Sequence, residues 1–492
     1  MGEINPTLMG ALLIGYVALQ IGIGIYVARG VKSETDYFLA GRNLGIIPIA
    51  LSIFATWFGA ETVMGSSAAI AEGGLAGARA EPFGYALALV LMALLIAGAF
   101  RARGYITIAD FFRERYGPRA EVLASVLSVI VSVIWASAQL LAFAVILKTT
   151  FDVPQTVTLI VATLIVVFYT SFSGLLGDIV TDMIQGAVLL IGLFLLFGAV
   201  ANAFGGFGPM LSAIKPHQLN LIGPDETWLS RIDAWAIPIL GSLIAQEAIS
   251  RILAARNPQL ARTATIAAAG LYLAVGMIPV IIGLAGVHLA IAGATGDDFL
   301  PTLAQELLPP FAAVIFLGAL LSAILSTVDS NLLSISSFVS VNILSKRHAR
   351  TDANGRLLMA RATTVFAGVV AALLAASGQS IYELIALTSV FGQAGILVAV
   401  LIGMNSKFGG PKAALAGMVA CVGANIFTYV VWPLAEMANG GIRAGAGFAK
   451  IIAGEAPVFE GGFLLSLLVS LIAYSAGAWF DRRARAISGL AV

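Results

Sequence analysis

Ionisable residues are scarce in this chain. Only 11% of its 492 residues are Asp, Glu, Lys or Arg, whereas 59% are hydrophobic. This composition is typical of a polytopic membrane protein and argues against an ordinary soluble enzyme. The net charge is only +1 and no dense basic block is present, so nucleic acid is not expected as a partner.

Cysteine and histidine are scarcer still. The single cysteine, Cys421, cannot form an intrachain disulfide, and its apolar surroundings are typical of a small buried residue. The three histidines are scattered, without a nucleophile-plus-base pair or an HExxH-type motif. The sequence therefore predicts neither an enzyme nor an organic cofactor.

Long apolar runs dominate the chain instead. Counting runs of about 18 or more residues predicts an all-α fold with thirteen transmembrane helices. They lie near 7–28, 46–71, 80–100, 120–147, 155–173, 178–203, 232–253, 263–292, 309–345, 358–377, 380–404, 411–434 and 459–480. The first run lacks a small-residue cleavage site, so we expect a retained helix rather than a signal peptide. We therefore expect the protein to lie in a lipid bilayer.

The basic residues predict the orientation of these helices. With the N-terminus outside and the C-terminus in the cytoplasm, most of the 27 Lys and Arg residues fall in inner loops, Arg251 among them. This is the bias that the positive-inside rule requires. We therefore expect a multi-pass protein of the plasma (inner) membrane.

The order of the helices predicts an internal symmetry. Residues 46–210 and 211–408 each hold five predicted helices, and the two groups have opposite orientations. One helix precedes them in residues 1–45, and two follow in residues 409–492. The pattern indicates a 5+5 inverted repeat, an arrangement that many transporters share.

Each repeat opens with an apolar helix that polar residues and glycines interrupt. The first holds Gly59 and Glu61, and the second holds Gly241, Gln246 and Glu247. An ionisable residue at membrane depth is costly and marks a functional site by default. Two interrupted helices in corresponding positions therefore predict a transport site near the middle of the membrane.

The ninth predicted helix is dense with hydroxyl groups. Helical spacing puts four polar residues on roughly one face, with Thr327 beside them: Ser322, Ser326, Asp329 and Ser330. Hydroxyl, carbonyl and carboxylate oxygens are hard ligands that suit an alkali cation. Serine and threonine also help helices to pack, but packing alone leaves Asp329 unexplained.

The sixth predicted helix adds two carboxylates. We expect Asp178 at the cytoplasmic interface and Asp182 one turn deeper. Two interpretations of Asp182 stay open: it pairs with an inner-loop arginine, or it helps to couple a cation and faces the ninth helix.

Four motifs in order resemble the sodium:solute symporter family. They are YFLAGRNLG, GYITIADFFRERYG, SGLLGDIVTDMIQ and GALLSAILSTVDSNLLS, which begin at residues 37, 104, 173 and 318. The resemblance implies the LeuT-type inverted-repeat fold with one additional helix in front. It also implies Na+ as the coupling ion and a small-molecule solute as the cargo.

The resemblance further implies the ligands of the sodium ions. A principal site would use carbonyl and hydroxyl oxygens of Ala55, Phe58, Ala323, Ser326 and Thr327. A second site would use Asp182, Asp329 and Ser330. The family pattern usually has two glycines and an uncharged residue before that aspartate, whereas this chain has Ser173–Gly174 and Asp178.

Three aromatic residues make the chain more similar to the choline branch of that family than to its sugar branch. They stand in TWFGAETVMG, EPFGYALAL and IWASAQ and are Trp57, Tyr85 and Trp135. Such rings can surround a quaternary ammonium group through cation–π contacts. The predicted substrate site is completed by Gly59, Glu61, Thr62, Gln246 and Glu247.

Alternatives to a choline symporter remain open from the sequence. The choline branch has a further tryptophan where this chain has Ala245, and the aromatic residues can also belong to the core. A helix N-terminus at a break could instead receive the carboxylate of an amino acid such as proline, or of a small monocarboxylate. A membrane sensor that binds solute without transporting it is the alternative of another class.

Overall fold

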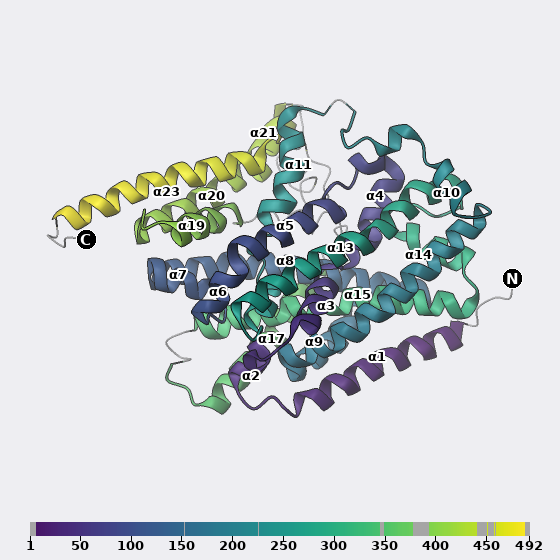
Figure 1. Cartoon of the computed structure of the whole chain (residues 1–492), viewed down its shortest axis with the longest axis horizontal. Coiled ribbons are helices and arrows are strands. Elements are labelled where there is room, and N and C mark those ends of the chain that lie inside the picture. Colours follow the sequence, from purple (N-terminus) through teal and green to yellow (C-terminus); the bar gives the residue numbers. More distant parts are fainter. Residues whose placement is uncertain are drawn as a thin grey trace.

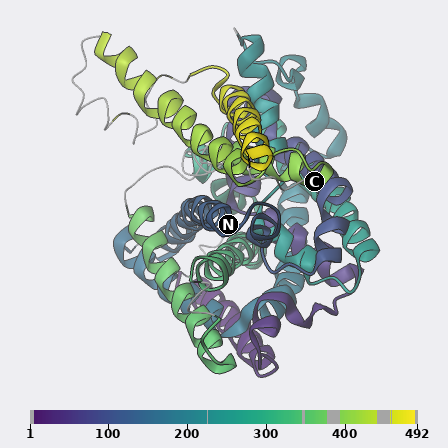
Figure 2. The same cartoon turned by 90° about the vertical axis from the view of Figure 1, so that its left-hand side faces the viewer.

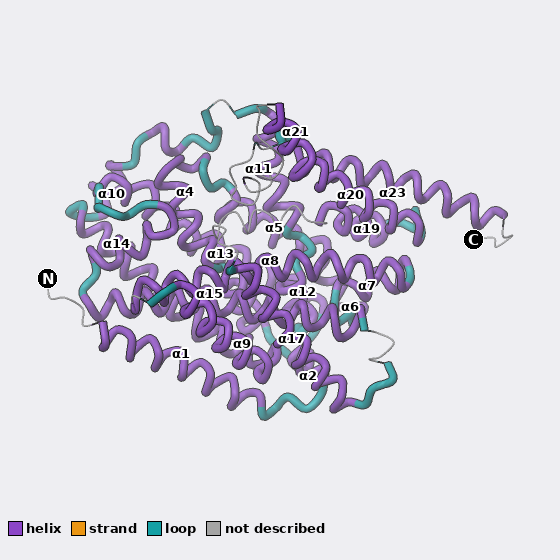
Figure 3. Tube along the Cα trace, turned by 180° about the vertical axis from the view of Figure 1, so that it is seen from behind, coloured by secondary structure: helices purple, strands orange, loops and turns teal. Residues whose placement is uncertain are grey.

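The computed structural model describes residues 6–151, 153–224, 226–344, 349–376, 393–439, 450, 457 and 459–487. Nearly all of these residues lie in helices that pack side by side around a buried centre (Figures 1 and 2). Mostly short loops join the helices (Figure 3). In the described part of the chain, ten helices are long and apolar enough to cross a membrane, and one bent pair of helices makes an eleventh. The protein is thus an all-helical, multi-pass membrane protein.

The first part of the chain contains the bent pair. Helix α3 (Ile46–Trp57) is followed by the π-helical turn η2 (Glu61–Gly65) and by α4 (Ser66–Gly73). The two arms of the pair differ in direction by 61°. The interruption that Gly59 and Glu61 predict is therefore present, and it spans residues 58–60.

The other helices of this first part largely follow the predicted runs. Helix α1 (Pro6–Ala28) precedes the pair, together with the short α2 (Glu34–Leu39). After it come η4 (Ala80–Gly84), α5 (Tyr85–Met92), η5 (Ala93–Ala97), α6 (Gly98–Arg103), α7 (Ile108–Tyr116), α8 (Pro118–Phe151), α9 (Gln155–Ala203) and α10 (Phe207–Ala213).

The break within helix α9 is shorter than the sequence predicts. The sequence predicts two helices separated by residues 174–177, but the backbone leaves helical geometry within α9 only at Gly174, where φ is 57° and ψ is −174°. A straight helix of 49 residues would be roughly 74 Å long, more than twice the thickness of the hydrocarbon core. The single-residue turn therefore divides α9 into two arms.

A second interrupted helix opens the later part of the chain. Helix α11 (Trp228–Gly241) ends before residues 242–245, and α12 (Gln246–Leu253) continues from there. The helices that follow are α13 (Pro258–Gly286), α14 (Phe299–Leu307), α15 (Pro310–Ser337) with η9 (Phe338–Ile343), α17 (Ala353–Ala375), α19 (Gln393–Asn405), α20 (Pro411–Ile426), η10 (Phe427–Val431), α21 (Trp432–Asn439) and α23 (Gly462–Ile487). Residues 380–392 of the predicted run 380–404 lie outside the described residues.

Helix α15 is the centre of the molecule. Every residue from Phe316 to Ser337 is buried, and the helix packs against α3, α8, α9 and α17 (Figure 1). Its serines and threonine therefore face other helices rather than lipid. Hydroxyl groups in this position must find partners within the protein.

Candidate functional site

The last turn of α3 meets the hydroxyl groups of α15. The final carbonyl groups of a helix have no partner within it, because no helical N–H follows them. Here Ser326 Oγ donates a hydrogen bond to the carbonyl of Ala55 at 2.7 Å, and Thr327 Oγ1 donates to the carbonyl of Thr56 at 2.8 Å. The interruption of α3 thus exposes backbone oxygens that side chains of α15 approach directly.

The remaining two predicted sodium residues lie at the same crossing. The carbonyl of Ala323 accepts hydrogen bonds from both Ser326 Oγ and Thr327 Oγ1, each at 3.0 Å. Phe58 is the first residue of the interruption, with φ −89° and ψ 62°, and its N–H still donates to the carbonyl of Phe54. These neutral, hard oxygens are a donor set that fits an alkali cation.

The guanidinium group of Arg251 occupies the predicted acidic cluster. Its Nη2 lies 2.7 Å from Asp178 Oδ2, 2.9 Å from Asp182 Oδ2 and 2.6 Å from Ser330 Oγ. Its Nε donates to Ser52 Oγ at 2.7 Å. All five side chains are buried. The prediction that Arg251 lies in an inner loop is therefore wrong, because the residue belongs to α12 and its guanidinium is buried with the carboxylates that pair with it. Asp178 is buried within the protein as well.

The third carboxylate, Asp329, completes this cluster. It lies beside Asp178 and accepts a hydrogen bond from the N–H of Ser330 at 2.8 Å. The three residues predicted for a second sodium ion, Asp182, Asp329 and Ser330, are thus brought together. The guanidinium of Arg251 already contacts two of these three residues, Asp182 and Ser330.

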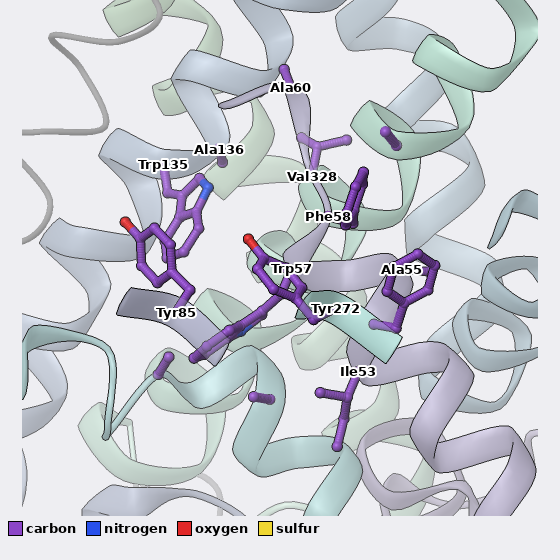
Figure 4. Close-up of a cluster of buried hydrophobic side chains, with 14 of the residues drawn as sticks. Ile53, Ala55, Trp57, Phe58, Ala60, Tyr85, Trp135, Ala136, Tyr272 and Val328 are labelled. Carbon is purple, nitrogen blue, oxygen red and sulfur yellow. The ribbon is translucent and has the colours of Figure 1, made fainter. Parts of the chain in front are cut away.

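The predicted aromatic residues gather on one side of the interruption of α3. Trp57 and Tyr85 are in edge contact, with ring centroids 6.0 Å apart and an interplanar angle of 76°. Figure 4 shows Trp135 next to Tyr85. The indole of Trp57 lies beside the carboxylate of Glu247 and that of Trp135 beside Glu61, but neither Nε1 is hydrogen-bonded.

Glu61 is held against the interruption by Gln139 of α8. Gln139 Nε2 donates to Glu61 Oε2 at 2.7 Å, and Gln139 Oε1 accepts from the N–H of Ala60 at 3.2 Å. A Cβ at Gly59 would lie 2.5 Å from Glu61 Oε2. Glycine at position 59 therefore leaves the space into which the Glu61 carboxylate folds.

Thr62 takes part in a buried network next to the aromatic residues. Its hydroxyl donates to the carbonyl of Trp57 at 3.2 Å and contacts Glu81 Oε1 at 3.1 Å and the hydroxyl of Tyr272 at 2.9 Å. Tyr272 in turn donates to Glu81 Oε2 at 2.5 Å. Thr62, predicted as a substrate residue, thus has its hydroxyl engaged within the protein.

Gln246 connects the second interruption to the chain before α7. Its Oε1 accepts from the N–H of Ile108 at 2.9 Å, and its Nε2 donates to the carbonyl of Ile106 at 3.3 Å and to Ser250 Oγ at 3.0 Å. The side chain fixes the position of α12, so its polar atoms serve the protein itself.

A pocket lies beside the second interruption. Helix α8 contributes Ser132 and Trp135, the interruption contributes Ser242 and Ala245, and α12 contributes Gln246 and Glu247. Glu247 Oε1 is buried and accepts no hydrogen bond. The pocket therefore joins an aromatic ring and a carboxylate that the sequence assigns to the substrate.

An ion pair outside the membrane-spanning helices supports this region. Arg79, which precedes η4, donates to both carboxylate oxygens of Glu226 at 2.8 and 2.5 Å. These hydrogen bonds hold the pKa of Glu226 below its ordinary value. The pair therefore stays ionised at neutral pH and ties the start of the third span to the loop before α11.

Several residues of the site have no distinctive motif in the sequence. Gln139 stands one helical turn after Trp135, and Arg251 one turn after Glu247, so helical periodicity could have placed both on the site face. Nothing in the sequence distinguishes Ser52 as a partner of Arg251.

The chain is similar to known proteins over most of its length. The model of the sodium:solute symporter family matches residues 37–421. The high-affinity choline transporter 1 of Drosophila melanogaster is 29% identical over 404 residues, which cover 77% of this chain and 64% of that one. The sodium/pantothenate symporter of Escherichia coli (strain K12) is 28% identical over 436 residues, which cover 83% of this chain and 87% of that one. The chain thus spans just under two thirds of the fly transporter.

Solved structures show the same fold. A Na+-coupled sialic acid symporter in its substrate-bound, outward-open state matches 97% of this chain and 98% of its own, with a TM-score of 0.79 and 19% identity. A nucleobase-cation-symport-1 family transporter matches with a TM-score of 0.57 and 13% identity. The family prediction from the four motifs is confirmed: this chain is a member of the sodium:solute symporter family, a family of transporters rather than enzymes.

Proposed function

We propose that this protein is a sodium-coupled symporter that imports a small organic cation. One observation carries the proposal: the hydroxyls of Ser326 and Thr327 meet the carbonyls at the interruption of α3. Unwound backbone carbonyls at a broken helix are the usual ligands of a coupling ion in transporters of this architecture.

Sodium would act by joining two parts of the molecule. Its ligands would be the carbonyls of Ala55, Phe58 and Ala323 and the hydroxyls of Ser326 and Thr327. Ser326 and Thr327 now donate to carbonyls of α3, so they would turn their lone pairs toward the ion and their protons away. A bound ion would thereby hold α3 against α15 and favour the conformation that receives the solute.

The solute would bind next to this crossing. Trp57, Tyr85 and Trp135 offer ring faces to a choline-like cation, and Glu61 and Glu247 offer negative charge. The same carboxylates repel an anion, which weighs against a monocarboxylate as the cargo. The choline transporters among the relatives support a cation.

We propose thirteen membrane crossings for the whole chain. The ten long helices and the bent pair supply eleven. The two arms of α9 would count separately, and α19 would mark one more crossing. In Figure 1 helix α1 begins at the right side of the molecule and α23 ends at the left side, and an odd number of crossings requires the two termini to lie on opposite sides.

This count supports the predicted topology. The protein would lie in the plasma membrane, with its N-terminus outside the cell and its C-terminus in the cytoplasm. Residues 46–210 and 211–408 would form the inverted repeats, each with one interrupted helix. The two repeats would move against each other around the site.

Uptake into proteoliposomes tests the sodium site. With radiolabelled choline as the probe, we expect S326A and T327A each to raise the sodium concentration for half-maximal uptake about tenfold, because each removes one ligand. The matched control is S334A, since Ser334 is buried on the same helix and donates to the carbonyl of Ser330 instead. Unchanged sodium dependence in both site variants would contradict the assignment.

A second variant tests the aromatic site through choline binding and through the stabilisation of the protein by sodium. We expect W57A to abolish choline binding while sodium alone still stabilises the protein, because the ring face is lost and the carbonyls of α3 remain. If the parent protein binds no choline-like cation, the proposal that the solute is a cation is refuted. The proposal that the protein is a symporter of some other solute would still stand.

A further inference from the structure

Two buried carboxylates occupy equivalent places at the two interruptions. Glu61 is the first residue of η2, and Glu247 is the second residue of α12. Their side chains come from different interrupted helices, and Trp135 connects them, because its indole lies beside Glu61 and also lines the pocket that contains Glu247. Glu61 is 5% and Glu247 3% exposed, so neither carboxylate is solvated by bulk water.

Neither carboxylate has a basic partner. In the described part of the chain, no ion pair joins Glu61 or Glu247 to Lys, Arg or His. Arg251 lies one turn from Glu247, but its guanidinium is bound by Asp178 and Asp182. An ionised carboxylate that is buried without a partner costs several kcal/mol, so such a group either takes up a proton or meets a positive group from a ligand.

The groups around the two carboxylates point to a ligand. Glu247 Oε1 accepts no hydrogen bond and lines the pocket together with Trp135. The indole nitrogens of Trp57 and Trp135 lie beside the carboxylates without a hydrogen bond. Glu61 Oε2 accepts a hydrogen bond from Gln139 Nε2. Glu247 Oε1 is thus a buried acceptor of the pocket that the protein leaves without a donor.

We propose that Glu61 and Glu247 together bind a cation that donates N–H hydrogen bonds, a protonated amine, in preference to a fully alkylated ammonium. This inference rests on the proposed function and names the substrate class of that site. A quaternary ammonium has no N–H and would leave Glu247 Oε1 desolvated and unpaired, whereas a protonated amine donates to this oxygen and still presents its charge to the rings.

A methylation series on the parent protein tests the proposal. The probes are choline, N,N-dimethylethanolamine, N-methylethanolamine and ethanolamine, with binding followed by thermal shift of the purified full-length protein in sodium and in potassium. We expect the dissociation constant to fall at least about tenfold from choline to ethanolamine, as hydrogen bonds to a charged group replace methyl contacts.

Matched variants assign the effect to the two carboxylates. E61Q and E247Q should each remove the preference for ethanolamine over choline, and the control E306Q, on the exposed side of α14, should keep it. The series on the parent protein decides the question even where a variant does not fold. The midpoint of unfolding in sodium alone shows which variants are folded.

Three outcomes overturn the inference. Choline could bind as tightly as the demethylated amines, or E61Q and E247Q could both leave the preference intact. The amines could also fail to bind while another solute stabilises the protein in a sodium-dependent way, in which case symport stands and the protonated-amine site fails. Absence of any sodium-dependent stabilisation by any solute would instead refute the proposed function on which this inference rests.

Discussion

Gly174 is the residue on which the division of α9 depends. Its φ of 57° and ψ of −174° lie in a region that only glycine adopts without strain. A Cβ there would come 2.8 Å from Cδ2 and 3.0 Å from the carbonyl oxygen of Tyr37. Tyr37 is fully buried and its hydroxyl lies 3.3 Å from that of Thr364, so it has little room to move.

G174A should lower the free energy of unfolding by about 1–2 kcal/mol or more, because the new methyl group adds both backbone strain and a clash. The matched control is G198A on the same helix, where nothing lies within 4 Å of the added Cβ. The midpoint of thermal unfolding in detergent measures both, and equal midpoints would contradict the strained turn.

Arg251 shows what the sequence cannot predict at the scale of residues. Ser326 and Thr327 are predictable because hydroxyls at helical spacing in an apolar run indicate a polar face. Arg251 has the same periodicity relative to Glu247, but it ends an apolar run and therefore resembles a loop residue. Its burial depends on Asp178 and Asp182, which come from a helix distant in the sequence and become neighbours only in the fold.

Among the elements, the interrupted helices are more predictable than the turns. The interruption of α3 follows from a glycine and a glutamate in an apolar run, since these residues lower the cost of unwinding and mark a site. The turn in α9 is shorter than predicted because one glycine with positive φ reverses the chain without a loop. Hydropathy detects the apolar residues on both sides but not the conformation of the glycine between them.

Asp233 connects two helices that lie far apart in the sequence, α11 and α23. This residue of α11 accepts hydrogen bonds from the N–H groups of Phe463 and Leu464 at 3.1 and 3.0 Å. Both belong to the first turn of α23, whose N–H groups have no partner within the helix. The last helix is therefore anchored to the arm that leads into the second interruption.

We expect D233A to destabilise this anchor. Loss of a capping carboxylate costs about 1 kcal/mol, typically between 0.5 and 2. Hydrogen exchange should become faster at residues 463 and 464, while the amides of α15 keep their protection. The control is E436A, an exposed residue of α21. Unaltered exchange at the start of α23 would show that Asp233 does not act as its cap.

At the scale of the whole molecule, the position of one buried positive charge, the guanidinium of Arg251, bears on how many sodium ions can bind. Two groups of oxygens lie on α15, one facing the interruption of α3 and the other facing α9. The first contains neutral oxygens, whereas the second already contains a guanidinium. The guanidinium already lies within hydrogen-bond distance of Asp178, Asp182 and Ser330, so a sodium ion at this second group would have to displace it from them. We therefore expect one coupling ion per cycle.

The last prediction follows from this asymmetry. Uptake by the parent protein should depend on sodium with a Hill coefficient of about one, because a single ion binds with each solute. The substitution R251M should cost about 3–5 kcal/mol of stability in potassium, since it leaves Asp178 and Asp182 without a partner in a buried place. Sodium should recover part of that stability in R251M but not in the triple variant D178N/D182N/R251M. A Hill coefficient near two in the parent protein would show that a second ion enters despite the guanidinium.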